Sequence, residues 1–222
     1  MSARDKTVLL TAFEPFGGET ANASLCALEA VDSSAVTGRL VTCVLPVVFD
    51  DALVALKRAL RRHRPDVVIC CGQAGGRSAI TVERVAINVD DARIPDNAGA
   101  QPIDRPIAVR GPAAYFSSLP IKAIVAALQE QGIAAEVSQT AGTFVCNHVF
   151  YGLMRTFSRR RGIRGGFIHL PYVPEQARAA HEASGVPQPS LPLATLARGL
   201  EVAAQLSLHT ERDLVAVGGA TH

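Results

Sequence analysis

One cysteine lies where a strand-like segment gives way to a helix-like one. Residues 138–154 read SQTAGTFVCNHVFYGLM, in which the chain turns at Ala141 and Gly142 and a helix is predicted to begin near Cys146. A thiol at a helix N-terminus lies at the positive end of the helix dipole, which lowers its pKa and favours the thiolate that a nucleophile requires. Cys146 is therefore a candidate nucleophile, and a buried structural cysteine is the alternative interpretation.

His169 is the histidine best placed to act as the base for that thiol. It belongs to the apolar segment GFIHLP, residues 166–171, which predicts a strand that ends at a proline, near the edge where α/β sheets bind ligands. His148 is closer to Cys146 in sequence, but residues two apart on a helix do not face each other. The alternative for His169 is a core histidine that is hydrogen-bonded to a carbonyl group.

Glu83 is the candidate acid for orienting the histidine. It is a carboxylate within the apolar run ITVERVAIN, residues 80–88, where a charge rarely lies without a partner. A structural ion pair, with Arg84 or Arg93, is the alternative, and no sequence rule separates the two interpretations.

A glycine-rich turn, GQAGGR at residues 72–77, follows an apolar strand-like run. Such a turn can present backbone N–H groups to an anion or to a carbonyl oxygen. It lacks the spacing of a phosphate-binding loop and no helix clearly follows it, so a tight turn is the preferred interpretation. No metal-binding spacing occurs either, so nothing in these motifs points to a metal.

The order of strand-like and helix-like segments indicates how these residues are positioned. Apolar and β-branched runs predict strands at residues 7–12, 39–45, 66–71, 80–89, 135–140 and 166–170. Helical spacing predicts helices at residues 21–31, 50–62, 121–131, 147–159 and 191–208, the last with Ser190 as N-cap. Alternating strands and helices indicate parallel strands with helices on both faces, which is an α/β fold.

The length of 222 residues suits one compact domain. We predict a single α/β domain over residues 1–209 and a flexible tail over residues 210–222. Residues 90–120 show no clear period and are punctuated by prolines. A loop of this length is usually functional, so we expect it to be a lid or a contact surface.

Composition excludes several classes of partner. The net charge of +2 is too small to indicate nucleic acid or an anionic membrane, and the basic clusters at residues 61–64 and 159–161 fall where helices are predicted to end. No apolar run is long enough to span a membrane, and no secretory signal is recognised. The five cysteines form no C-x-x-C pair, and adjacent Cys70 and Cys71 would point to opposite faces of a strand. Free thiols in a cytoplasmic protein are the simplest interpretation.

Five stretches in the same chain resemble the pyroglutamyl-peptidase I (pyrrolidone-carboxylate peptidase) family. They are LLTAFEPFGGETANAS at residues 9–24, GQAGGR with ITVERVAIN at 72–88, ARIPDNAG at 92–99, QTAGTFVCNHVFYGLM at 139–154 and GFIHLPYVPEQ at 166–176. They span almost the whole chain in the order found in the family. The departures are small: Ala12 stands where the family often has glycine, and Ala23 where proline is common.

The resemblance implies a fold and a reaction. The fold is a three-layer α/β/α sandwich with a twisted, mostly parallel mixed sheet. The reaction is removal of an N-terminal pyroglutamate from small peptides, without a cofactor, by a homotetramer. The family's Cys-His-Glu triad corresponds to Cys146, His169 and Glu83.

The resemblance also implies a substrate pocket. Its members correspond to Phe13, Phe16, Gln73 and Val145, and Arg93 is similar to an arginine near the oxyanion.

Two other functions stay open on the residues alone. A nucleoside phosphorylase-like enzyme on a similar sheet would hold phosphate at residues 72–77 and would not need Cys146. A catalytically inactive protein that binds blocked peptide ends would keep a pocket at Phe13 and Phe16, and only turnover would distinguish it.

Overall fold

The computed structural model describes residues 5–158, 160 and 162–218. At its centre is a six-stranded sheet in the order β2-β1-β3-β8-β4-β7. The strands β1 (Thr7–Phe13), β2 (Arg39–Leu45), β3 (Val67–Gln73) and β8 (Arg164–Leu170) are mutually parallel. The strand β4 (Ile80–Glu83) runs antiparallel to β8, and β7 (Ala135–Ser138) is parallel to β4. The sheet is therefore mixed and mostly parallel, as the family resemblance implied.

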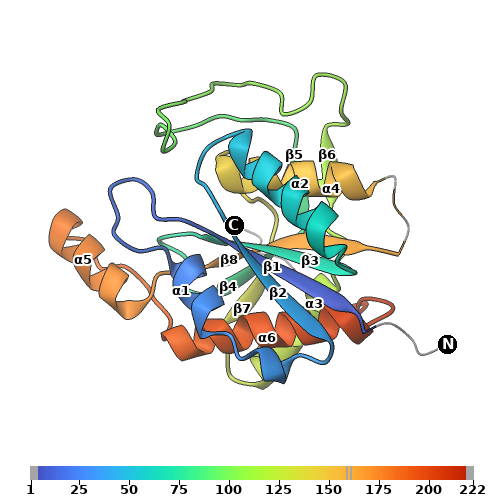
Figure 1. Cartoon of the computed structure of the whole chain (residues 1–222). Coiled ribbons are helices and arrows are strands. Elements are labelled where there is room, and N and C mark those ends of the chain that lie inside the picture. Colours follow the sequence, from blue (N-terminus) through green and yellow to red (C-terminus); the bar gives the residue numbers. More distant parts are fainter. Residues whose placement is uncertain (1–4, 159, 161, 219–222) are drawn as a thin grey trace.

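Helices cover both faces of this sheet (Figure 1). On one face lie α1 (Ala23–Ala30), α3 (Ile121–Glu130) and α6 (Leu193–His209). On the other lie α2 (Asp51–His63), α4 (Val145–Phe157) and a small hairpin of β5 (Val85–Ile87) and β6 (Ala114–Phe116). A short 3-10 helix, Ser33–Ala35, precedes β2. The predicted three-layer α/β/α architecture is confirmed.

Two separate cores follow from the alternation of side chains along each strand. In β1, Val8 and Leu10 pack with α1, α3 and α6, whereas Leu9 packs with α2 and α4. Cys71 and Cys70 of β3 divide between the same two cores, as predicted for adjacent strand residues. All five cysteines are free thiols.

Residues 80–89 do not form the single strand that the sequence predicted. The chain leaves the central sheet at Arg84, whose N–H donates to Ser138 O and whose carbonyl accepts from Ser117 N. Glu83 thus ends β4, and β5 belongs to the hairpin. The apolar run carried no signal for this break, because both halves are covered by other elements.

Three other elements differ from expectation. Helix α5 (Pro174–Ser184) was not predicted, because its alanine-rich and largely exposed sequence carries no apolar stripe. Helix α6 begins after Pro192, so Ser190 is not its N-cap. Residues 90–120 are largely irregular, as predicted, but they include β6 and a bridge between Asp90 and Arg105.

The segment that follows α6 contains neither helix nor strand over residues 210–218. It lies against the start of α3, where Pro120 offers no side-chain cap. Asp213 Oδ1 accepts instead from the backbone N–H groups of Lys122 at 3.1 Å and Ala123 at 2.9 Å, and so caps that helix. The flexibility of the tail stays a prediction, and its last residues, 219–222, lie outside the described residues.

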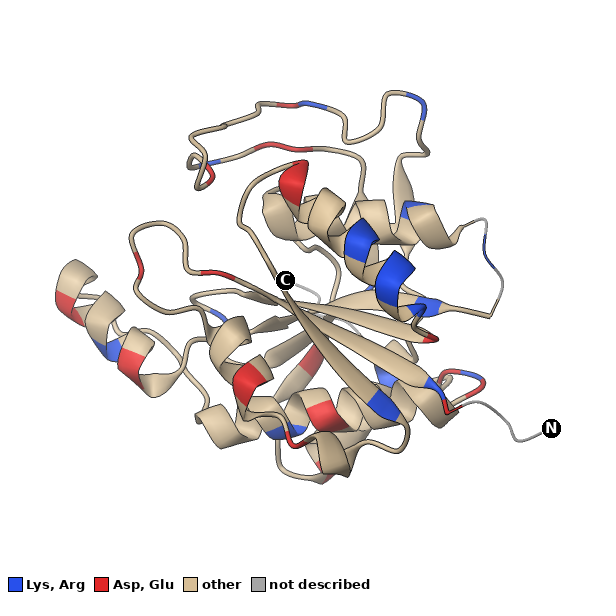
Figure 2. Ribbon diagram, viewed as in Figure 1, with Lys and Arg blue, Asp and Glu red and all other residues tan. Residues whose placement is uncertain are grey.

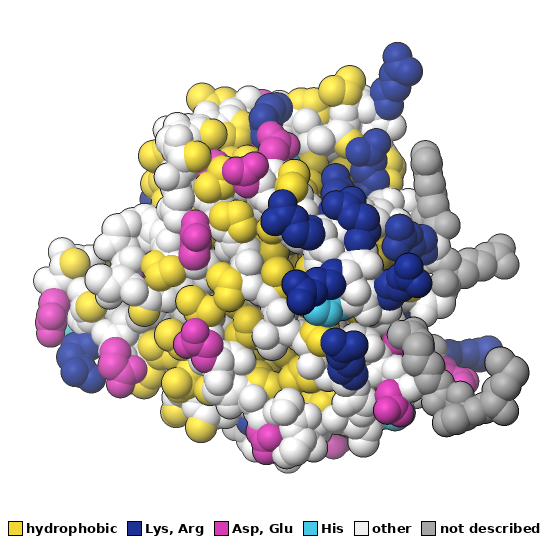
Figure 3. All heavy atoms as spheres, in the orientation of Figure 1, with side chains coloured by type: hydrophobic (Ala, Val, Ile, Leu, Met, Phe, Trp, Pro, Cys, Tyr) yellow, Lys and Arg dark blue, Asp and Glu magenta, His cyan; other side chains and the backbone are white. Residues whose placement is uncertain are grey.

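Basic side chains gather over α2 and its neighbours (Figures 2 and 3). Arg61, Arg62 and His63 occupy the last turn of α2, where the helix dipole favours cations, as predicted. In the second basic cluster, residues 159 and 161 lie outside the described residues. Within the described part of the chain, no helix has the length and apolar character needed to cross a membrane.

Candidate active site

A histidine and a carboxylate meet on the face of the sheet that α4 covers. His169 Nδ1 lies 2.8 Å from Glu83 Oε1. The two residues come from neighbouring antiparallel strands, in which Thr81 is the direct partner of His169 and Glu83 is the diagonal one. Because an ionised carboxylate only accepts hydrogen bonds, Nδ1 carries the hydrogen, and Nε2 is left as the basic nitrogen.

The thiol of Cys146, in the first turn of α4, lies on the same face of the sheet as this pair. A β-carbon added to Gly72 would lie 2.8 Å from Cys146 Sγ and 2.9 Å from the ring of Phe167. Gly72 is the direct partner of His169 in the register between β3 and β8. The absence of a side chain at Gly72 therefore leaves the space that the sulfur occupies beside the histidine strand.

The pKa of the thiol moves opposite to the shift that the helix dipole predicted. Burial, and to a smaller extent the Glu83 carboxylate, raise the pKa of Cys146 to about 12, although the charge of Arg77 acts in the other direction. The sulfur packs against sheet residues that the sequence could not place beside it. In the free protein, Cys146 therefore carries its proton and needs a base when it attacks.

His169 is suited to take that proton. Burial lowers the pKa of His169 below its ordinary value, and the hydrogen bond and charge of Glu83 only partly offset this effect. The imidazole is thus neutral near pH 7 and available as a base. The resting state is a neutral thiol beside a neutral imidazole.

Glu83 stays ionised although it is fully buried. Burial alone would raise the pKa of Glu83, but the hydrogen bond from His169, together with the charge of Arg77, lowers it below its ordinary value. Arg77 Nη1 lies 2.6 Å from Glu83 Oε1. The ion-pair partner is therefore Arg77, not Arg84 or Arg93 as proposed from the sequence, and Arg84 instead donates to Gly218 O. Glu83 therefore forms both the ion pair and the contact with the histidine that the sequence analysis considered as alternatives, the first with Arg77 and the second with His169.

An apolar hollow adjoins the thiol. Of the residues predicted for a substrate pocket, Phe13, Phe16, Gln73 and Val145 line it, together with Cys146. Three further lining residues were missed by the sequence analysis: Asn22, Val47 and Phe144. Phe144 directly precedes α4, and its ring centroid lies 6.0 Å from that of Phe16 and 5.4 Å from that of Phe49. The signal for Phe144 was its place in the motif around Cys146.

Arg93, which the family resemblance placed near the oxyanion, has an exposed side chain in the loop after Asp91. That loop is tied to the start of α4, since Asp91 N donates to Thr143 O at 2.9 Å and Thr143 Oγ1 donates to Asp91 O at 2.7 Å. The backbone thus brings the loop close to Cys146, while the role of the Arg93 side chain stays a prediction.

Two polar residues that follow Cys146 hold α4 in place. Asn147 accepts from Ile87 N at 3.0 Å and donates to the carbonyl of the same residue at 2.9 Å. His148 Nδ1 lies 2.9 Å from Oδ1 of the buried Asp90. His148 therefore faces away from the thiol, as its spacing predicted, and it anchors the long loop. Neither partner had a local sequence signal.

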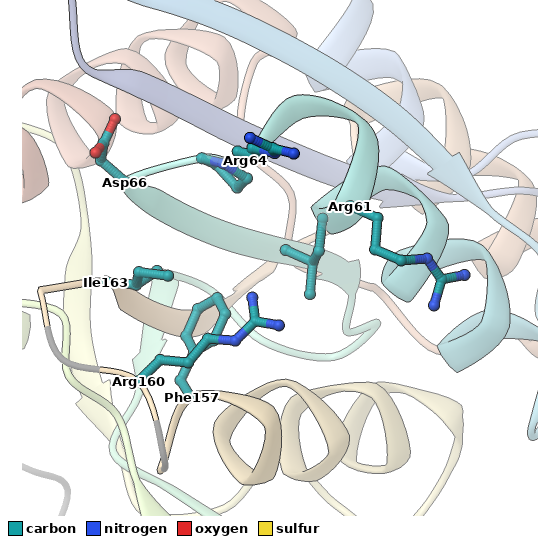
Figure 4. Close-up of a pocket in the computed structure, with 8 residues that line it drawn as sticks. Arg61, Arg64, Asp66, Phe157, Arg160 and Ile163 are labelled. Carbon is teal, nitrogen blue, oxygen red and sulfur yellow. The ribbon is translucent and has the colours of Figure 1, made fainter. Parts of the chain in front are cut away.

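Another hollow lies at the opposite edge of the sheet (Figure 4). Arg61, Arg64, Asp66, Phe157 and Arg160 are among the residues that line it. These residues precede β3 and β8, whereas Gly72, Gln73 and His169 lie near the carboxyl ends of the same strands. In open α/β sheets ligands bind beyond the carboxyl ends, which favours the hollow beside Cys146 as the active site.

Known proteins share both the sequence and the fold. Residues 6–210 match the family model described as pyroglutamyl peptidase. The chain is 54% identical over 218 residues, 98% of its length and 100% of the relative, to a pyrrolidone-carboxylate peptidase of Escherichia fergusonii. A pyrrolidone-carboxylate peptidase of Bacillus cereus is 53% identical over 220 residues, covering 98% of this chain and 100% of the relative.

Solved structures agree with these relatives. The crystal structure of pyroglutamyl peptidase I from Bacillus amyloliquefaciens superposes with a TM-score of 0.90 at 49% identity, covering 96% of this chain and 100% of that one. Pyrrolidone carboxyl peptidase from Thermococcus litoralis gives a TM-score of 0.88 at 38% identity, covering 96% of this chain and 99% of that one.

The shared fold, with a thiol beside a carboxylate-bound imidazole, puts the protein among the cysteine-type peptidases. Because the family model and relatives above 50% identity extend over nearly its whole length, the chain belongs to the pyroglutamyl peptidase family. The relatives support neither alternative function. Against a phosphate site at residues 72–77, the arginine of that turn, Arg77, forms an ion pair with Glu83.

Proposed function

We propose that this peptidase removes an N-terminal pyroglutamate from small peptides by acyl transfer, with Cys146 as nucleophile, His169 as acid and base, and Glu83 as the orienting carboxylate. The reaction itself follows from membership of the family. The assignment of roles rests on one observation: Cys146 Sγ fills the space above Gly72, the strand partner of a histidine that is bound to a buried carboxylate.

Acylation begins with a proton transfer, because both partners are neutral at rest. The sulfur of Cys146 attacks the pyroglutamyl carbonyl carbon as the thiol proton passes to His169 Nε2. The oxyanion that forms lies near the N–H groups of the first turn of α4, which have no acceptor within the helix, with Arg93 as a further donor. His169 then gives its proton to the departing amine nitrogen, the C–N bond breaks, and a thioester remains.

Deacylation uses the same residues in reverse. Water loses a proton to His169 Nε2 and attacks the thioester carbonyl. The C–S bond breaks, pyroglutamate leaves, and the proton returns to Cys146. Glu83 holds the Nδ1–H tautomer and stabilises the imidazolium present between the two proton transfers.

Hydrolysis of a fluorogenic pyroglutamyl amide, with and without iodoacetamide, tests this function. Turnover that alkylation of the thiol abolishes is the expected result. Binding without turnover would favour a non-catalytic protein. A phosphate-dependent cleavage of nucleosides that survives alkylation would favour a phosphorylase.

Substituting Glu83 by glutamine is expected to lower kcat more than it raises KM. The loss should be roughly 10²- to 10⁴-fold, because glutamine can present the wrong hydrogen-bonding group to His169 and does not stabilise imidazolium. Steady-state kinetics of the purified variant measure the effect, which should remain smaller than the loss in Cys146→Ala.

Arg77→Gln is the matched control, since it removes the other half of the ion pair and leaves the bond between Glu83 and His169. Both variants should lower the melting temperature, because Arg77→Gln leaves a buried carboxylate without its cation and Glu83→Gln leaves a partly buried guanidinium without its anion. Full activity per folded molecule in Glu83→Gln would show that the carboxylate serves only the ion pair.

We also propose that the peptidase is cytoplasmic and forms a homotetramer. The free thiols support the location. Three large apolar side chains within residues 90–120 are exposed and support assembly: Ile103 is 75% exposed, Val109 87% and Phe116 71%. Light scattering should give a mass about four times that of one chain.

Val109→Asp should weaken that assembly, whereas Val186→Asp, at a position 56% exposed beyond α5, should not. A monomer with full activity at micromolar concentration would contradict both the assembly and its necessity.

A further inference from the structure

Glu19 lies at the centre of a hydrogen-bonded cluster beside the active site. Its Oε1 accepts from Tyr172 Oη at 3.0 Å. Its Oε2 accepts from Gln73 Nε2 at 2.8 Å and from Gln176 Nε2 at 3.0 Å. The cluster joins the loop that follows β1 to α5, and these two segments lie side by side in Figure 1. Gln73 carries the cluster into the hollow beside Cys146.

The cluster determines the orientation of the Gln73 side-chain amide, that is, which of its two positions the oxygen and the nitrogen occupy. Gln73 Oε1 accepts from the backbone N–H of Ala23 at 2.8 Å and from Gln176 Nε2 at 2.7 Å. A backbone N–H only donates and the carboxylate of Glu19 only accepts, so both demand the same orientation. Rotating the amide by 180° would place its oxygen against the Glu19 carboxylate and its N–H groups against the Ala23 N–H.

Tyr172 keeps Glu19 in this arrangement. Burial, the hydrogen bond and the charge of Glu19 raise the pKa of Tyr172 to about 12, so its hydroxyl stays protonated and donates. The Tyr172 ring also packs over Gly75, where an added β-carbon would lie 2.5 Å from the ring. The carboxylate is thus held through the oxygen that Gln73 does not use.

The amide of Gln73 has one hydrogen-bonding group left for a ligand. Nε2 carries two hydrogens, and among the described residues only Glu19 accepts from it. Oε1 already accepts from two donors. Of the two polar atoms of this side chain, Nε2 therefore keeps a hydrogen that no described residue accepts, whereas both lone pairs of Oε1 are used.

We propose that Glu19 is a specificity-determining positioning residue, which holds Gln73 with a donor toward the hollow and thereby selects a ring that carries a carbonyl oxygen. The ring carbonyl of a pyroglutamyl group satisfies that donor, whereas a ring without it leaves the N–H unpaired in an apolar site. Unpaired polar groups of this kind are what make hydrogen-bonding sites reject analogues. This inference rests on the proposed function of the hollow as the pyroglutamyl site.

The experiment compares two amides with the same leaving group. One is a pyroglutamyl amide, and the other is a cyclopentanecarbonyl amide, which keeps the ring size and neutrality but lacks the ring N–H and C=O. In Glu19→Ala the ratio of their kcat/KM values should fall about tenfold or more, mainly through a higher KM for the pyroglutamyl amide. Glu19→Gln should recover part of the ratio, because its amide oxygen still accepts from Gln73. The ratio does not depend on the fraction of active protein in a preparation.

A double-substitution cycle shows whether Glu19 acts through Gln73. In a Gln73→Ala background, Glu19→Ala should leave the ratio unchanged. Tyr172→Phe, which removes one hydroxyl, should lower the ratio by a smaller factor and serves if Glu19→Ala does not fold. Thr20→Ala is the matched control: Thr20 is the exposed neighbour of Glu19 on the same loop, and the ratio of this variant should equal that of the wild type.

Each outcome decides one question. An unchanged ratio in Glu19→Ala, or an equal effect in the Gln73→Ala background, would overturn the role of Glu19. A rise in the ratio would mean that Glu19 acts on the substrate directly, and it would overturn the proposal as well. Failure of the wild-type protein to cleave the pyroglutamyl amide would instead overturn the proposed function.

Discussion

Cys146→Ala is expected to remove nearly all turnover of a pyroglutamyl amide while the protein stays folded. No other group beside the apolar hollow can form the thioester, and loss of a catalytic nucleophile typically costs roughly 10⁴-fold or more in kcat. The fold should survive because the change removes a single sulfur atom in the first turn of α4 and leaves alanine, the best helix former, in its place. Rates of hydrolysis and thermal unfolding of the same preparation measure the two parts of this expectation.

Cys26→Ala is the matched control, since Cys26 is another partly exposed thiol on the N-terminal turn of a helix, α1. Helix α1 covers the other face of the sheet, and burial raises the pKa of Cys26 as well. Its activity should equal that of the wild type, and iodoacetamide should still inactivate it. Substantial turnover in pure Cys146→Ala would remove Cys146 from the mechanism, whatever the control shows.

The fold and the three candidate catalytic residues could be predicted because their signals are local. Cys146 stands at the start of a helix, His169 near the end of an apolar strand, and Glu83 as a lone charge in an apolar run. Each of these patterns spans fewer than ten residues, and the five family motifs contain all three. The outer helices followed from helical spacing and from the alternation of strands and helices, whereas the mixed sheet followed from the family resemblance.

Properties that depend on contacts between distant segments could not be predicted. The pKa of Cys146 rises because the sulfur is buried against Gly72 of β3. A rule that considers only the helix terminus does not include this contact. The partner of Glu83 is Arg77, across a turn that the sequence presented only as glycine-rich.

The Glu19 cluster was missed for the same reason. Its members come from the loop after β1, the end of β3 and the region of α5, and α5 itself was not predicted. Single polar residues on separate segments carry no periodic signal, so only the folded chain shows that they meet.

Substrate specificity should be strict at the ring. We expect kcat/KM for a pyroglutamyl amide to exceed that for the matching prolyl amide at least ~10³-fold. The two rings have the same size, but proline carries a charged secondary ammonium and lacks the ring carbonyl. The hollow between Phe13 and Phe16 is largely apolar, so it accepts a neutral ring and penalises an unpaired charge. The donor at Gln73 would also remain unpaired with proline.

The measurement uses pyroglutamyl, prolyl and glutamyl amides that share one leaving group. The glutamyl amide is the control for ring closure, because it has the atoms of an opened lactam with a charged amine and a charged carboxylate. It should fail as the prolyl amide does, since neither charge finds a partner among Phe13, Phe16 and Val145. If the hollow recognised only ring size, prolyl and pyroglutamyl amides would react at comparable rates. That result would overturn the argument from charge and hydrogen bonding even with Cys146 established as nucleophile, because shape alone would then account for the selection.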